Sequence, residues 1–102
     1  MNIPTITDIA TALRVYYENS ELSNKEIKEL FGSLSSATVA RLKKRVKEEM
    51  INQNVPAYGL NKVNTKIAYE MWGIDVLDLE KRIIKLRSLG LTEKNHSVIE
   101  HN

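Results

Sequence analysis

The chain of 102 residues contains no cysteine, so it can form neither a disulfide bond nor a metal site with thiolate ligands. Its four glycines are scattered, and none belongs to a glycine-rich loop of the kind that cradles phosphates. No stretch approaches the roughly 18 apolar residues of a membrane-spanning helix, and the start of the chain lacks the basic and apolar regions of a signal peptide. We therefore expect a soluble cytoplasmic protein that has no contact with a membrane.

Features typical of an enzyme are equally scarce. The only histidines, His96 and His101, are five residues apart, which does not match the i, i+4 spacing of a helical metal site. Glu48 and Glu49 fit a solvated helix end better than an acid–base pair. The sequence therefore predicts no catalytic residue, no metal site, no cofactor and no enzymatic activity.

The composition is that of one small globular domain, because 42% of the residues are hydrophobic. The formal net charge is only +2, but the charges are unevenly distributed. Residues 41–47 include five basic side chains and no acidic one. A polyanionic partner responds to such a local concentration of charge more than to the total.

The spacing of the apolar residues predicts an all-α fold, a bundle of five helices. Each predicted helix begins beside a residue that can cap it: Thr5 or Thr7, Ser23 with Glu26 as a capping box, Ser35 or Ser36, Asn61 or Asn64, and Asp75. The expected ranges are 7–18, 24–31, 36–52 and 76–89, and the fourth helix is expected to begin after Asn61 or Asn64 and to end at Gly73. Gly90 is expected to end the last helix.

The third predicted helix has the pattern of a helix that enters the major groove of DNA. Its apolar stripe opposes a face that carries small residues early and cations later. Arg41 is placed to reach guanine, and Lys44 a base edge or a phosphate. Hydroxyl groups at the helix start favour phosphate, and the remaining cations are expected to point toward the groove walls. The predicted DNA contacts are Ser35, Ser36, Ala37, Thr38, Ala40, Arg41, Lys43, Lys44, Arg45 and Lys47.

This segment resembles the helix-turn-helix found in many bacterial and phage DNA-binding proteins. The matching residues are Ile27, Leu30-Phe31-Gly32, Leu34-Ser35 and Ala37-Thr38-Val39-x-Arg41-Leu42. The resemblance covers about 25 residues. It departs from the usual pattern at Ile27, where a small residue is common, and in a turn that is one residue longer. The resemblance implies a DNA-binding unit at 1–54 whose recognition helix is 36–52.

Residues 55–90 are expected to form a second helical pair. This pair is expected to act either as a dimerisation unit or as a second helix-turn-helix in tandem with the first. Its Met71-Trp72-Gly73 matches Leu30-Phe31-Gly32, and Arg82-Ile83 follows at the same distance as Arg41-Leu42. This likeness reflects either an old duplication or the ordinary form of two consecutive helix pairs. Residues 91–102 are expected to form either a polar tail or a short C-terminal hairpin resembling a wing.

Together these features predict a sequence-specific protein that binds double-stranded DNA, a transcriptional regulator from a bacterium or phage that acts as a homodimer. Lys81, Arg82 and Lys85 are predicted as secondary phosphate contacts, and Leu77 and Ile84 as a dimer interface, because they lie off the main apolar stripe of the last helix. The alternative is a protein-interaction module: a phage assembly factor, a subunit similar to a small terminase, or an anti-repressor.

Overall fold

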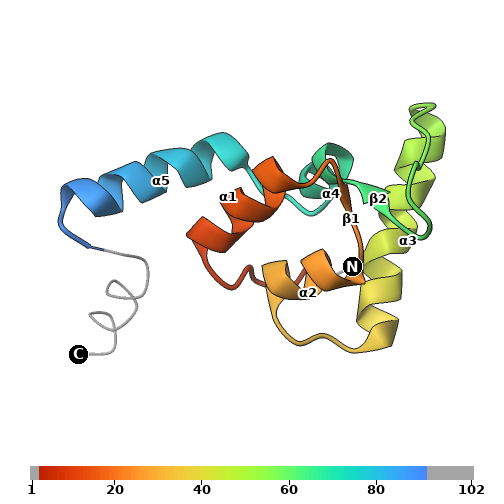
Figure 1. Cartoon of the computed structure of the whole chain (residues 1–102), viewed down its shortest axis with the longest axis horizontal. Coiled ribbons are helices and arrows are strands. Elements are labelled where there is room, and N and C mark those ends of the chain that lie inside the picture. Colours follow the sequence, from red (N-terminus) through yellow and green to blue (C-terminus); the bar gives the residue numbers. More distant parts are fainter. Residues whose placement is uncertain (1–2, 92–102) are drawn as a thin grey trace.

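The structure, a computed structural model, describes residues 3–91 and is mainly helical (Figure 1). Its elements, in chain order, are α1 (Ile9–Glu18), β1 (Glu21–Leu22), α2 (Asn24–Phe31), α3 (Ser36–Asn52), β2 (Val63–Asn64), α4 (Thr65–Met71) and α5 (Val76–Ser88). The predicted helical class and the five helices are confirmed within this range. The hairpin or tail predicted for 91–102 lies outside the described residues, apart from Leu91.

Most helix starts follow from local capping. Ser23 and Glu26 form the predicted capping box of α2, and Ser35, Asn64 and Asp75 cap the next three helices. The predicted start of α1 is wrong, because Asp8 is its cap and accepts a hydrogen bond from the N–H of Thr11 at 2.6 Å.

Thr7 instead ties the N-terminal segment to the end of α2. Its backbone N–H donates to the carbonyl of Leu30 at 2.8 Å, and its hydroxyl lies 3.1 Å from the carbonyl of Glu29. These bonds satisfy carbonyl groups in the last turn of α2, which have no partner inside the helix. Because the hydroxyl of Thr7 bonds a carbonyl group at the end of α2, it does not cap α1.

The two short strands are an exception to the predicted all-α fold. β1 and β2 pair antiparallel, with Glu21 opposite Asn64 and Leu22 opposite Val63. This ladder joins the segment before α2 to the segment after α3. Strands of two residues are too short to show an alternating pattern, so the sequence does not predict them.

The core is one cluster of buried side chains that includes residues of every helix. Trp72 of the second helical pair packs edge-on against Phe31 at a centroid distance of 5.4 Å, and its indole N–H donates to the carbonyl of Leu42 at 3.4 Å. The hydroxyl of Tyr69 donates to the carbonyl of Ala12 at 2.6 Å. The predicted units 1–54 and 55–90 therefore share one core.

α5 is the least embedded helix. Leu79 is the only buried residue of this helix, and the main packing partner of the helix is α1. Figure 1 shows α5 at one end of the long axis of the molecule and α3 at the other. The described part measures 44 × 25 × 21 Å, so the two helices present separate surfaces.

Candidate nucleic-acid interface

The connection between α2 and α3 consists of residues 32–35. Gly32 adopts φ +87°, a conformation that side-chain-bearing residues rarely adopt, and its N–H closes the last turn of α2 on the carbonyl of Lys28 at 2.7 Å. Leu34 packs against the core, and Ser35 then caps α3. These contacts fix the direction in which α3 leaves α2.

The orientation of α3 follows from its apolar stripe. Val39, Leu42, Val46 and Met50 are buried in the core. Because an α-helix turns about 100° per residue, the opposite side presents the set Ala37, Arg41, Lys44 and Glu48, all exposed. Ser36, Ala40 and Lys47 are also exposed beside that set. We call this surface of α3, from Ser36 to Lys47, the basic face.

The start of the basic face carries a short network of polar groups. The hydroxyl of Ser35 accepts the N–H of Thr38 at 3.1 Å and lies 2.9 Å from the Thr38 hydroxyl. The Arg41 guanidinium donates to that Thr38 hydroxyl at 3.2 Å. Arg41 therefore leans toward the N-terminus of α3, where the helix dipole also favours an anion.

The cations of the basic face are not neutralised by neighbouring acids. Within residues 3–91, no carboxylate forms an ion pair with Arg41, Lys44, Arg45 or Lys47. In contrast, Arg14 pairs with both Glu18 and Glu29. The positive charge of α3 is thus free to act on a partner.

Lys43 differs from the prediction that it points toward a groove wall. It is only 7% exposed, and its Nζ donates to the side-chain oxygen of Asn24 at 3.0 Å. Burial, together with the nearby charge of Lys47, lowers the pKa of Lys43. Lys43 is buried because of its position around the helix: it lies four residues after Val39 and three before Val46, beside the buried stripe.

A lysine outside the predicted set of contacts, Lys62, lies beside the basic face. Burial alone would raise the pKa of Glu26, but hydrogen bonds from Ser23 and the charges of Lys62 and Lys25 lower it. Both lysines therefore lie close to the start of α2. Lys62 also lines a hollow together with Lys47 and Ile51 of α3.

A second hollow continues this flank along α3 and is lined by Asn24, Lys43, Lys44 and Lys47. The basic face thus borders Asn24 of α2 and Lys62 of the connection to β2. No local signal in the sequence groups Lys62 with α3, because only the tertiary fold brings it near that helix.

The connection from α3 to β2 is held to β1 by one side chain. The two carboxylate oxygens of Glu21 accept the N–H groups of Tyr58 and Gly59 at 2.7 and 2.8 Å. This attachment leaves Tyr58 87% and Leu60 91% exposed. The connection therefore presents two large apolar side chains to solvent beside Lys62.

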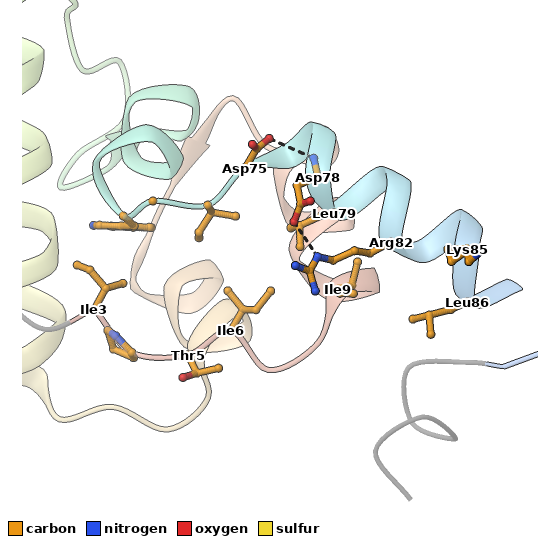
Figure 2. A pocket seen from close by; sticks show the side chains of 14 residues that line it. Ile3, Thr5, Ile6, Ile9, Asp75, Asp78, Leu79, Arg82, Lys85 and Leu86 are labelled. Atoms are coloured by element: carbon orange, nitrogen blue, oxygen red, sulfur yellow. Dashed lines mark hydrogen bonds and ion pairs between the residues drawn. The ribbon is translucent and has the colours of Figure 1, made fainter. Parts of the chain in front are cut away.

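The structure does not bring the predicted secondary contacts, Lys81, Arg82 and Lys85, together with the basic face. They belong to α5, at the opposite end of the molecule (Figure 1). Figure 2 shows Arg82 and Lys85 of α5 beside a hollow that is also lined by Ile6 of the N-terminal segment and Ile9 of α1. Arg82 also pairs with Asp78 at 2.7 Å, which partly offsets its charge.

Within residues 3–91, no three acidic, histidine or cysteine side chains gather closely enough to hold a metal ion. None of the helices described there has both the length and the hydropathy to cross a membrane. His96 and His101 lie outside this range. No protein-family model, curated protein or solved structure matches the chain.

Proposed function

We propose that the protein binds double-stranded DNA in a sequence-specific manner and regulates transcription in a bacterium or phage. α2, the connection 32–35 and α3 would act as a helix-turn-helix with α3 in the major groove. The observation that carries the proposal is the basic face itself: exposed cations without acidic partners, on one side of a helix whose other side is buried. This is the arrangement that a recognition helix requires.

The order of residues along α3 suits close approach to base pairs. Ala37 and Ala40 are small and exposed, so they leave room for the helix in a groove about 12 Å wide. Arg41 would donate two hydrogen bonds to the O6 and N7 atoms of guanine. To do so it would exchange its single bond to Thr38 for the bonds to guanine.

Phosphate contacts would surround this central position. Ser35, Ser36 and Thr38 offer hydroxyl groups at the helix start, and Arg45 and Lys47 extend toward the sides of the groove. Lys25 and Lys62 add charge beside the start of α2. Lys43 is left out of this set, since its amine is buried against Asn24.

A charge-reversal pair tests the proposal. Lys44→Glu places an acid in the centre of the basic face and is expected to weaken binding to duplex DNA at least tenfold. Lys66→Glu changes an exposed lysine on α4, outside the basic face, and is expected to have less than twofold effect. Fluorescence anisotropy on a labelled duplex measures both. Equal losses for the two variants would contradict the assignment of the surface.

One observation favours the alternative, a protein-interaction module such as a phage assembly factor, a small-terminase-like subunit or an anti-repressor. Tyr58 and Leu60 are almost fully exposed, and large apolar side chains in solvent are typical of protein-binding surfaces. Under this alternative the protein does not bind duplex DNA even at low salt. The DNA titration therefore separates the two functions.

A further inference from the structure

α5 carries an apolar patch that nothing in the described chain covers. Leu77 is 71% and Ile84 64% exposed. Because they are seven residues apart, they lie two turns apart on the same side of the helix. Glu80 lies between them and accepts a hydrogen bond from the hydroxyl of Tyr17. This bond raises the pKa of Tyr17, whose side chain is 63% exposed. We call Leu77, Ile84 and Tyr17 the α5 patch.

The charges of α5 are divided along its length. The acids Asp75, Asp78 and Glu80 occupy its first half, and the cations Lys81, Arg82, Lys85 and Arg87 its second half. Two such helices attract each other when they run antiparallel, since the acidic half of each then faces the basic half of the other. A parallel pair would place like charges together.

We infer that the α5 patch binds the α5 patch of a second copy of this chain, with the two helices antiparallel. A two-fold axis that passes between Glu80 and Lys81 produces both the apolar contact and the charge contact in a single register. It places Leu77 of each copy on Ile84 of the other, and Glu80 of each copy beside Lys81 of the other.

A second copy fits this surface because the surface is complementary to itself. Both apolar contacts and the charge contact arise from the same register, which is the condition for a closed two-fold interface. Of the other apolar residues of α5, Leu79 is buried, and Val76, Ile83 and Leu86 are partly buried. The dimer rests on α5 alone and not on DNA binding, so each can fail without the other.

The absence of cysteine allows a direct test of the register by cross-linking. Leu77→Cys and Ile84→Cys variants are prepared separately, mixed under reducing conditions and then oxidised. In the antiparallel pair, residue 77 lies opposite residue 84, whereas the two copies of residue 77 are offset by about 10 Å along the helices. A disulfide bond spans a Cα separation of only about 4.4–6.8 Å.

The mixture is therefore expected to cross-link, whereas each variant alone stays monomeric on a non-reducing gel. Gln53→Cys, at the end of α3, serves as a control for random oxidation. Cross-linking of each single variant on its own, to at least the extent seen in the mixture, would indicate a parallel pair and overturn the inference. A mixture that cross-links no more than the Gln53→Cys control would overturn it as well.

The native chain tests the dimer without a cross-link. Light scattering at micromolar concentration is expected to give twice the monomer mass of 11.7 kDa. Ile84→Glu is expected to raise the dimer dissociation constant at least tenfold and to leave the helical circular-dichroism signal unchanged, because Ile84 is exposed in the single chain. Leu60→Glu is the matched control, an exposed leucine outside the α5 patch. A monomeric native chain at 100 μM, or an equal effect of both variants, would overturn the inference.

Discussion

Replacing Arg41 with alanine should reduce DNA affinity in a sequence-dependent way. In the free protein Arg41 is exposed, forms no ion pair within residues 3–91 and makes one hydrogen bond, to Thr38. Its removal should therefore change the free energy of unfolding by less than about 0.5 kcal/mol, as for most surface substitutions. Any large effect on binding then reports the DNA contact rather than damage to the fold.

The expected size of the binding effect follows from the bidentate contact. Loss of an arginine–guanine pair costs about 1–3 kcal/mol, which corresponds to a roughly 5- to 150-fold weaker affinity. The loss should be confined to sites that carry the guanine read by Arg41. On sites in which that base pair is changed, Arg41→Ala and the native protein should bind with similar affinity.

The assay begins with selection of a preferred site from random duplexes, followed by anisotropy titrations on that site and on its single base-pair variants. Lys47→Ala is the matched control, because Lys47 is an exposed cation of the same helix for which only phosphate contact is proposed. It should weaken binding to all sites alike and make the salt dependence shallower by about one unit. Equal losses from both variants on every site would refute base readout by Arg41.

Two predictions concern stability. The pKa of Glu26 is lowered in the folded protein, so its carboxylate stabilises the fold above the ordinary glutamate pKa of about 4.3, and this contribution is lost as the pH falls through the folded pKa. The free energy of unfolding in urea should therefore fall less between pH 7 and pH 3 for Glu26→Gln than for the native chain. An equal fall in both proteins would show that the Glu26 carboxylate does not contribute to the pH dependence. Lys43→Met removes a buried amine whose pKa is lowered by burial, so the free energy of unfolding at pH 7 should be unchanged or higher by up to about 1 kcal/mol. A loss of more than about 2 kcal/mol would show that the bond from Lys43 to Asn24 outweighs the cost of burial.

Features that depend on neighbours in sequence could be predicted from the sequence. The ranges of α2 and α3 agree with the structure because Ser23, Glu26 and Ser35 cap them through local hydrogen bonds. The buried stripe of α3 is equally local, since it follows from helical periodicity. These elements already define most of the basic face.

Features that depend on distant segments could not be predicted in this way. The β1–β2 ladder pairs residues more than 40 positions apart, and Thr7 bonds the end of α2 instead of capping α1. The burial of Lys43 against Asn24 and the approach of Lys62 to α2 likewise require the tertiary fold. The basic face predicted from the sequence therefore loses Lys43, which is buried, and gains Lys62 at its edge.

The central claim is that the basic face binds duplex DNA, and a salt titration of the native protein tests it most directly. Neutralisation of about four to six phosphates per chain predicts that log K falls with log salt at a slope of about −4 to −5. Affinity for a random duplex should then fall on the order of 10²–10³-fold between about 50 and 200 mM salt. No detectable binding at about 50 mM salt, or binding that does not change over this range, would contradict the claim.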